Sequence, residues 1–427
     1  MESYAPMRIL VYGISFAPEL TGVGKYTGEM VAWLATRGHD LRVVTAPPYY
    51  PDWRVGYGYS PWEYRRECFR FDDRSGVWAQ RCPIWVPREP SGTKRLLHLC
   101  SFALSSSPVA MANLRWRPNV VMTVEPTLTV APTALLLARL SGAKSWLHVQ
   151  DFEVDAAFDM GMLGAGRLKK LAMWWERALL SRFDRVSTIS NRMRERLGEK
   201  GVGDEAQVLF LNWADTHGIR PLDVPSGFRR ELGLANDTVV VLYSGNLGEK
   251  QGLEVLVQAA ERTISENGVV WVMAGAGSAR ARLEALSSGL SNVRWLPLQP
   301  VERLNDLLNL ADIHVLPQRA DAADLVMPSK LTGMLASGRV TVATAAEGTQ
   351  VGQVMDECGV RVPPGDAGAL ADAVIRLAHD EVRRRALGAK ARDYAERYLG
   401  YDSIMTRFEA ELNALVYGTE RPIAGEK

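Results

Sequence analysis

The hydrophobic residues gather in short unbroken runs that alternate with stretches of helical spacing. Residues 8–14 (RILVYGI) and 41–46 (LRVVTA) are two such runs, and a glycine-containing turn and a helical pattern ending at Arg37 and Gly38 separate them. Continuous apolar runs of this length predict strands that are buried on both faces of a parallel sheet. The beginning of the chain therefore predicts a strand, a helix and a second parallel strand.

The same order recurs in the second half of the chain. A run at 239–246 (VVVLYSGN) is followed by a glycine-rich turn, a helical pattern at 253–263 and another run at 269–275. Strand and helix alternate throughout, which predicts an α/β protein with two Rossmann-like domains. Further strands are expected at 293–298, 313–317 and 340–345.

Length, composition and one segment rich in Pro, Gly and Asp predict the domain organisation. A chain of 427 residues exceeds what one core usually serves, and 47% hydrophobic with 23% charged residues is typical of a globular enzyme. The segment 213–237 is rich in Pro, Gly and Asp, so we predict a linker there. The expected parts are a domain at 1–212, the linker, a domain at 238–395, and a C-terminal helix with a tail at 396–427.

The net charge is +1, but residues 1–117 hold 15 Lys and Arg against 10 Asp and Glu. This basic excess suits a phosphate-bearing acceptor or an anionic membrane face, and it also fits an ordinary solvated surface. The four cysteines show no C-x-x-C spacing, so we predict neither a zinc site nor a disulfide framework. We predict no nucleic-acid partner.

The relation of the chain to membranes depends on one segment. No apolar stretch reaches the roughly 18 residues of a spanning helix, and the N-terminus lacks the pattern of a signal peptide. Residues 94–117 place a short apolar run between basic ends, which fits a helix at the membrane interface or a buried helix. We expect a cytoplasmic protein that binds the membrane surface peripherally.

Two segments at strand-to-helix junctions, 245–252 and 328–331, are suited to hold phosphates, because backbone N–H groups at helix starts favour anions. In the second segment Ser329 is expected to cap a helix and Lys330 to contribute a cation. A nucleotide base is expected near two further glycines of the second domain. The candidate residues are Gly245, Asn246, Lys250, Gln251, Gly252, Gly275, Gly277, Pro328, Ser329, Lys330 and Leu331.

The first domain offers its own candidates. Asp151 follows the apolar end of a strand, so it is the first catalytic candidate, and His148 and Asp155 are weaker ones. A hydrogen-bonded core histidine is the alternative for His148. The segment 49–66, dense in Tyr, Trp and Arg, is interpreted as an acceptor-binding loop. A glycine loop that approaches the sugar is expected at Gly22, Val23, Gly24, Lys25 and Tyr26.

Five motifs are spread over nearly the whole chain: SFAPELTGVGKYTGEMVAWLA at 15–35, TAPPYYPDW at 45–53, HVQDFEVDAAFDMGML at 148–163, YSGNLGEKQGLE at 243–254 and ADLVMPSKLTGMLASG at 323–338. Together they resemble the motifs of family-4 retaining glycosyltransferases with the two-domain GT-B fold. Within that family they are most similar to fucosyltransferases of colanic-acid-type exopolysaccharide pathways.

The resemblance implies two domains that face each other across a cleft and a C-terminal helix that braces both. It implies that the C-terminal domain binds a GDP- or UDP-sugar donor and that the N-terminal domain binds the acceptor. Asp151 would orient the acceptor hydroxyl or accept its proton, and Lys330 would neutralise the leaving diphosphate without a metal or other cofactor. The glycine spacing lacks a dinucleotide fingerprint, which disfavours NAD.

We expect transfer of L-fucose from GDP-L-fucose to a lipid-diphosphate-linked oligosaccharide on the membrane. Transfer of a UDP-linked N-acetylated deoxysugar is the alternative donor chemistry. A nucleotide-sugar epimerase and a catalytically inactive nucleotide-sugar-binding protein are alternatives of other classes.

The chain departs from the family pattern in two places. Relatives carry paired glutamates where Leu325 and Gly333 stand, so the residue that holds the ribose is unassigned, and Asp321 or Asp324 are the substitutes nearby. An arginine and a lysine of relatives correspond to Asn246 and Gln251. Much of the phosphate charge is therefore expected to fall on Lys330, with help from Lys250.

Overall fold

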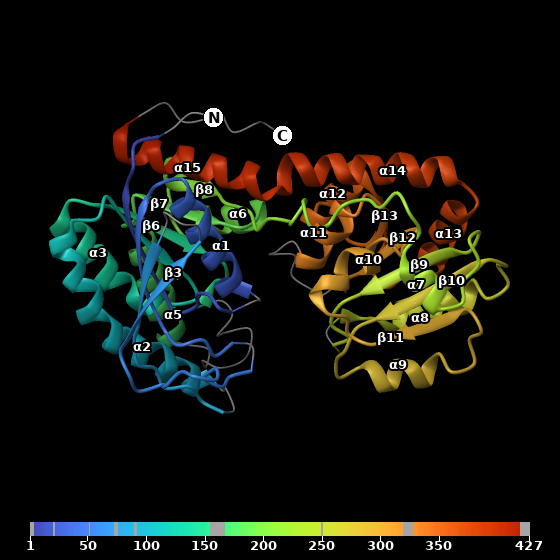
Figure 1. Ribbon diagram of the computed structural model, residues 1–427, viewed down its shortest axis with the longest axis horizontal. Coiled ribbons are helices and arrows are strands. Elements are labelled where there is room, and N and C mark those ends of the chain that lie inside the picture. Colours follow the sequence, from blue (N-terminus) through green and yellow to red (C-terminus); the bar gives the residue numbers. More distant parts are fainter. Residues whose placement is uncertain are drawn as a thin grey trace. The chain divides into compact units, whose positions relative to one another are not determined.

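The computed structural model describes residues 4–19, 22–50, 52–71, 76–88, 92–153, 167–248, 251–318 and 328–418. The chain divides into two compact units: Met1–Phe210 with Met405–Lys427 form unit 1, and Leu211–Ile404 form unit 2. Each unit is built on a largely parallel sheet with helices packed against it, as Figure 1 shows. The predicted α/β class with two Rossmann-like domains is confirmed.

The sheet of unit 1 has the order β3-β4-β2-β1-β5-β6-β7-β8 in the described residues. All neighbours are parallel except β3 and β4, which pair antiparallel at the edge. The central strands are buried over most of their length, as the unbroken apolar runs predict. The strands are β1 Arg8–Gly13, β2 Asp40–Thr45, β3 Arg65–Arg70, β4 Gly76–Arg81, β5 Val120–Val124, β6 Lys144–Val149, β7 Arg185–Thr188 and β8 Gln207–Leu209.

Helices cover the sheet of unit 1 because alternate strand residues present apolar side chains to each face. Leu10 and Tyr12 of β1 pack in one cluster with Phe102 of α2 and Leu137 of α3. The helices of unit 1 are α1 Gly22–Thr36, α2 Gly92–Ala112, η1 Asn113–Trp116, η2 Leu128–Val130, α3 Ala131–Ser141, α5 Arg167–Leu180, α6 Asn191–Glu199 and η3 Asp204–Ala206.

The sheet of unit 2 has the order β11-β10-β9-β12-β13-β14, and every recorded pair is parallel. Val241 of β9 packs with α8 and α13, whereas its neighbour Val240 packs with α7 and α10 on the opposite face. The strands are β9 Val239–Ser244, β10 Val269–Ala274, β11 Val293–Leu296, β12 Ile313–Pro317, β13 Val340–Thr344 and β14 Val360–Val362.

The segment that the sequence predicts as a linker lies within unit 2. It contains the short helix α7, and Phe228 of that helix is fully buried in the core of this unit. The helices of unit 2 are α7 Gly227–Glu231, α8 Glu254–Arg262, α9 Arg280–Leu286, η5 Val301–Arg303, α10 Leu304–Leu308, α11 Ser329–Ala336, α12 Gln350–Cys358, α13 Ala367–Ala378, α14 Glu381–Tyr394 and the π-helix η6 Ala395–Leu399.

The last helix, α15 Tyr401–Tyr417, begins in unit 2 and continues in unit 1. Within unit 1 the ring of Phe408 stacks on Phe210 at 4.1 Å between centroids and contacts Trp146 edge-on at 5.2 Å. The same helix carries Glu409, whose buried carboxylate is paired with Arg37 and His39. These contacts hold the C-terminal end of the described chain on the core of unit 1.

Candidate functional site

Glycine loops follow the carboxyl ends of β9 and β10 in unit 2. Gly245 has φ +141° and donates from its N–H to Ala274 O at 2.9 Å, and Leu247 N donates to Ala276 O at the same distance. The chain continues from β9 to β10 in one direction across the sheet and from β12 to β13 in the other direction. The loop after β9 therefore lies at the topological switch point of unit 2. Ligands of open α/β sheets bind at such points.

The glycines of these loops are also needed where the loops contact one another. A Cβ atom on Gly275 would lie 1.9 Å from Gly245 O, and one on Gly277 would lie 2.3 Å from Leu247 O. Both residues have positive φ, so a side chain would clash and strain the backbone. The structure therefore explains Gly275 and Gly277 by loop packing, and their expected contact with a base stays a prediction.

Lys330 reaches this loop pair from the first turn of α11. Its Nζ lies 2.5 Å from the hydroxyl oxygen of Tyr243 and 4.6 Å from the centroid of that ring. The Tyr243 hydroxyl donates in turn to Asn246 O at 2.7 Å. The sequence prediction did not include Tyr243, although its position near the end of β9, just before the glycine loop, was the available signal.

The ammonium group of Lys330 is half-buried, and burial lowers its pKa to about 8. No carboxylate in the described ranges forms an ion pair with it. A cation that is partly desolvated and faces no acid favours an anionic ligand. The structure thus brings Lys330 together with Gly245 and Asn246 at one end of the sheet.

The start of α11 differs from the prediction at its cap. Pro328 is the N-cap and makes no side-chain cap hydrogen bond, and Ser329 is the first helical residue, so the predicted Ser329 cap is wrong. The side chain of Ser329 lies outside the described residues. Leu331 is fully buried in the core, and its N–H is already satisfied by Pro328 O at 2.9 Å.

Some of the remaining donor candidates lie within the described residues and others lie outside them. Gln251 and Gly252 lie just before α8, and Gly252 has φ +65°. Gly333, where the resemblance implies a glutamate, faces Leu308 and Ile219, so its surroundings are apolar. Lys250, Asp321, Asp324 and Leu325 lie outside the described residues.

In unit 1 the histidine and the aspartate of the HVQD segment have different environments. His148 is almost fully buried, its Nδ1 lies 2.9 Å from Ser187 Oγ, and burial lowers its pKa to about 3. This arrangement favours the structural alternative for His148. Asp151 lies two residues beyond the end of β6 and is exposed, and Asp155 lies outside the described residues.

Two glutamates near Asp151 were not predicted as site residues. Burial raises the pKa of Glu153 to about 7 and raises the pKa of Glu125 well above its usual value, and the charge of Asp151 contributes in the same direction. Glu153 Oε2 accepts a hydrogen bond from Leu128 N at 2.7 Å. A carboxyl group directly after a buried strand, as at Glu125, was the sequence signal for this cluster.

The expected glycine loop of unit 1 is instead the first turn of α1. Gly22 has φ +60°, and a Cβ atom on Gly24 would lie 2.2 Å from Glu19 Oε2. Glu19 Oε1 accepts hydrogen bonds from the N–H groups of Tyr49 and Tyr50, so this carboxyl group ties the helix start to the loop after β2. Position 24 therefore requires glycine, because Glu19 occupies the space that a side chain would need.

The other residues of this turn make local contacts. Lys25 forms an ion pair with Glu29 at 3.2 Å and lies 4.8 Å from the ring of Tyr26. Val23 is half-buried. The aromatic segment after β2 contributes Tyr49 and Trp53, whose rings contact His98 of α2 at 4.8 and 5.4 Å.

Comparison with known proteins agrees with this arrangement. Residues 21–213 match the family model "Glycosyl transferase 4-like domain", and residues 238–380 match "Glycosyl transferases group 1". The chain is 44% identical, over 94% of its length and 98% of the relative, to the putative colanic acid biosynthesis glycosyl transferase WcaI of Escherichia coli (strain K12).

Solved structures extend the likeness to the fold. Sucrose-phosphate synthase from Thermosynechococcus elongatus matches with a TM-score of 0.70 and 18% identity over 97% of this chain and all of that one. Anabaena HepE, solved with UDP and glucose, matches with a TM-score of 0.66 and 14% identity over 96% of this chain and all of that one. The predicted resemblance to a GT-B glycosyltransferase of exopolysaccharide synthesis is confirmed.

Proposed function

This chain belongs to the glycosyltransferase family, and from that premise we propose that it transfers L-fucose from GDP-L-fucose, with retention, to a lipid-diphosphate-linked oligosaccharide. The transferase class follows from the family. An epimerase or an inactive binding protein is correspondingly disfavoured. The sugar, the base and the acceptor are the proposed parts.

The main observation in support of the proposed donor site is that Lys330 lies half-buried beside the glycine loop after β9. A diphosphate accepts hydrogen bonds from an ammonium group and gains from its charge, most strongly where water is partly excluded. Lys330 supplies such an ammonium group at a half-buried position beside Tyr243, and burial alone, with no charged neighbour in the described part of the chain, accounts for its lowered pKa. In the proposed reaction it neutralises the diphosphate as the bond to the sugar breaks, so no metal is required for that step.

Support for the pathway comes from the 44% identical relative, whose name assigns it to colanic acid biosynthesis. We propose that this chain serves a comparable exopolysaccharide pathway. UDP-sugar transfer is the second candidate, because HepE is a UDP-binding neighbour of the same fold. That neighbour shares only 14% identity, so it supports the fold of the donor domain and leaves the base open.

For the acceptor we propose unit 1, with Asp151 orienting the acceptor hydroxyl or accepting its proton. Asp151 is exposed at the carboxyl end of β6, where a substrate can reach it. The sequence shows no obvious carboxylate nucleophile of the paired kind that retaining glycosidases use, so we favour front-face attack assisted by the leaving phosphate. His148 stays a catalytic candidate, and a substitution at this position tests it.

Membrane binding is a separate part of the proposal. No helix in the described ranges is both long and apolar enough to cross a bilayer. Helix α2, which packs beside α3 in unit 1, exposes Leu96, Leu97 and Leu104, the last with 78% of its surface accessible. Lys94 and Arg95 precede these leucines, so the helix combines apolar and basic groups, as interfacial helices do.

The donor is tested by incubating the purified protein with GDP-L-fucose or UDP-N-acetylated sugars and a lipid-linked acceptor extract, with and without EDTA. Transfer from GDP-L-fucose that is insensitive to EDTA supports the proposal. Transfer from UDP-sugars alone replaces the donor with the second candidate, and loss of activity in EDTA contradicts the metal-free step. Conversion of the nucleotide sugar without acceptor would indicate an epimerase.

Membrane binding is tested by sedimentation with vesicles that contain anionic or only zwitterionic lipids. We expect binding to anionic vesicles that weakens at high salt, because exposed charges are screened. Replacing Leu96, Leu97 and Leu104 with serine is expected to reduce binding, whereas replacing the exposed Leu286 of unit 2 serves as the matched control. Equal binding by all three proteins would contradict the role of α2.

A further inference from the structure

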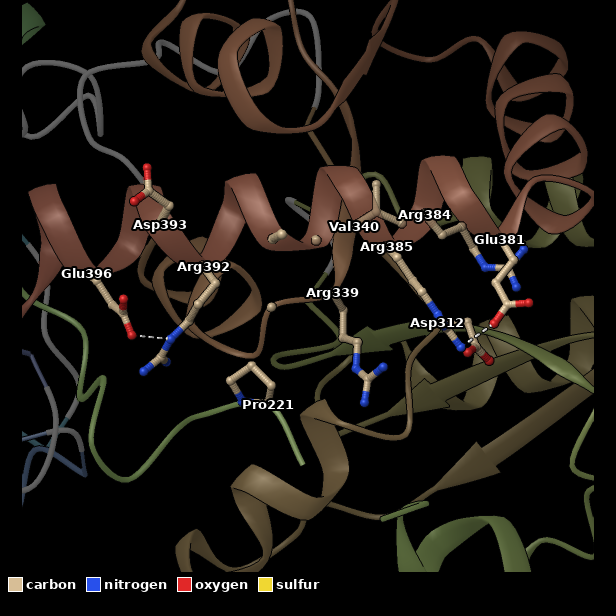
Figure 2. A pocket seen from close by; sticks show the side chains of 13 residues that line it. Pro221, Asp312, Arg339, Val340, Glu381, Arg384, Arg385, Arg392, Asp393 and Glu396 are labelled. Atoms are coloured by element: carbon tan, nitrogen blue, oxygen red, sulfur yellow. Dashed lines mark hydrogen bonds and ion pairs between the residues drawn. The ribbon is translucent and has the colours of Figure 1, made fainter. Parts of the chain in front are cut away.

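A cavity of about 540 Å³ opens at the amino ends of β12 and β13 in unit 2. Its wall is formed on one side by α14 and on the other by the residues that precede these strands, as Figure 2 shows. The glycine loops and Lys330 follow the carboxyl ends of the strands, so the cavity lies at the opposite edge of the same sheet. Its volume is within the range of small-molecule sites.

Four arginines line this cavity: Arg339, Arg384, Arg385 and Arg392. Two of them are held by backbone carbonyl groups of the protein. Arg384 donates from Nη1 to the carbonyls of Leu377 and Ala378, and Arg392 donates to three carbonyls and pairs with Glu396. The two remaining arginines, Arg339 and Arg385, come from different elements.

The carboxylates around the cavity are already paired. Asp312 bonds Arg229 at 2.6 Å and also accepts from Val240 N at 2.9 Å. Glu381 pairs with Arg385 at 2.6 Å near the surface, and Asp393 pairs with Arg397 at 2.8 Å. Each of these three carboxylates thus has an ion-pair partner other than Arg339.

Arg339 is the least satisfied of the four. Its Nη2 donates to Asn309 Oδ1 at 3.2 Å, but its Nε is buried without a hydrogen-bond partner. In Figure 2 its guanidinium group lies in the space between Pro221 and Asp312. Burial lowers the pKa of Arg339, and although Asp312 opposes the shift, the charges of Arg229 and Arg385 lower the pKa further.

A buried guanidinium donor without an acceptor costs free energy, and so do like charges that crowd in a partly desolvated space. An oxyanion in the cavity would offset the crowding of positive charges, and the planar fork of arginine matches the oxygens of phosphate. A cavity that holds such an arginine, and that is large enough for a ligand, is suited to a phosphate group.

We propose that this cavity is a second anion site, separate from the donor loops, which binds a phosphate group through Arg339 and Arg385. The phosphate is either inorganic phosphate or the monoester end of a larger metabolite. The proposal does not depend on the donor sugar or on the acceptor assigned above.

The test is a calorimetric titration of the full chain with inorganic phosphate and with glucose 1-phosphate, in a buffer without other oxyanions and at constant ionic strength. We expect saturable binding, and we expect Arg339→Gln and Arg385→Gln each to weaken it about tenfold or more, since a charge-assisted hydrogen bond is lost. Tighter binding of the ester would identify a phosphorylated metabolite as the ligand, and equal binding would identify phosphate alone.

Two controls separate this site from others. Arg376→Gln removes one exposed charge of unit 2 outside the cavity, and Lys330→Ala removes the cation of the donor loops. Arg376→Gln is expected to keep wild-type phosphate affinity, and the saturable phosphate binding that remains in Lys330→Ala is assigned to the cavity. If Lys330→Ala abolishes binding while the two cavity variants retain it, phosphate binds at the donor loops and the proposal is wrong.

Absence of saturable binding by the wild type, or an equal loss in Arg376→Gln, would also overturn the proposal. Should Arg339→Gln fail to fold, Arg385→Gln decides, because its ion pair with Glu381 is largely exposed and contributes little to folding. Thermal melting of each variant without phosphate verifies that it is folded.

Discussion

The Nζ atom of Lys330 lies 2.5 Å from the hydroxyl oxygen of Tyr243, so α11 and β9 meet at one point of unit 2. A Cβ atom on Gly245 would lie only 2.9 Å from Lys330 Cδ, and the glycine is therefore what permits this approach. The lysine is held against the loop by its own packing before any ligand arrives. Such prior positioning limits the entropy that ordering the side chain costs on binding.

Replacing this cation should weaken donor binding. We expect Lys330→Ala to lower affinity for the nucleotide-sugar donor about ten- to hundredfold, because charge-assisted hydrogen bonds contribute about 1.5–3 kcal/mol. The turnover rate should fall as well if the charge stabilises the leaving diphosphate. The matched control is Lys390→Ala, an exposed lysine of α14. Unchanged affinity and turnover in Lys330→Ala would refute the assignment.

Donor affinity should depend on pH through the same group. Burial lowers the pKa of Lys330 to about 8, and a bound diphosphate favours the charged form, so binding takes up a proton above that pH. Affinity is therefore expected to fall as pH rises from 8 to 9, by at most about tenfold per unit. The dissociation constant measured by calorimetry from pH 7 to 9 checks this. The same decline in Lys330→Ala would assign it to another group.

Gly24→Ala should destabilise unit 1. The new methyl group would lie 2.2 Å from Glu19 Oε2, and Glu19 cannot move without releasing the N–H groups of Tyr49 and Tyr50. A loss of about 1–3 kcal/mol is expected from such overpacking. Gly203→Ala is the control, because a Cβ atom there meets nothing within 4 Å. Urea unfolding that gives equal stabilities for both variants would contradict this packing argument.

His148→Asn separates a structural from a catalytic histidine. Burial lowers the pKa of His148 from 6.5 to about 3, so the unfolded chain binds its proton first as the pH falls. The contribution of neutral His148 is fully present above pH 6.5 and is lost as the pH falls toward 3, at up to about 1.4 kcal/mol per unit. The variant should therefore show a shallower decline in the free energy of unfolding over this range.

Turnover at pH 7 provides the second readout for this variant. A structural role predicts that the folded variant keeps most of its turnover, because the buried ring contacts Ser187 and Phe210. A collapse of turnover with unchanged stability would establish the catalytic role instead. His379→Asn, which changes an exposed histidine of unit 2, is the control.

The strands and the main helices were predictable because their signals are local. The apolar run at 239–246 is β9 with its following turn, and the helix opened by Pro328 is α11, since buried strands and helix starts need particular residues at particular spacings. The same local signals made Asp151, just beyond β6, and Lys330, in the first turn of α11, the site candidates.

Local signals failed where distant segments supply the environment. Ser329 was expected at the N-cap, but Pro328 is the N-cap and Ser329 is the first helical residue. Gly24 was attributed to a glycine loop that approaches the sugar, whereas Glu19 occupies the space of its missing side chain. The burial of His148 against Ser187 and Phe210 depends on β7 and on the chain after β8, which its neighbours in sequence cannot indicate.

The sequence by itself thus determined the α/β class, the order of the elements, the family and the residue types at the strand ends, because each is encoded in periodicity or short motifs. Only the tertiary structure decided that Tyr243 meets Lys330, that the buried Glu125 and the half-buried Glu153 lie near Asp151, and that the Nε of Arg339 lacks an acceptor. These facts depend on which surfaces fold against one another and how much water they exclude. Charge, pKa and ligand preference follow from that exclusion.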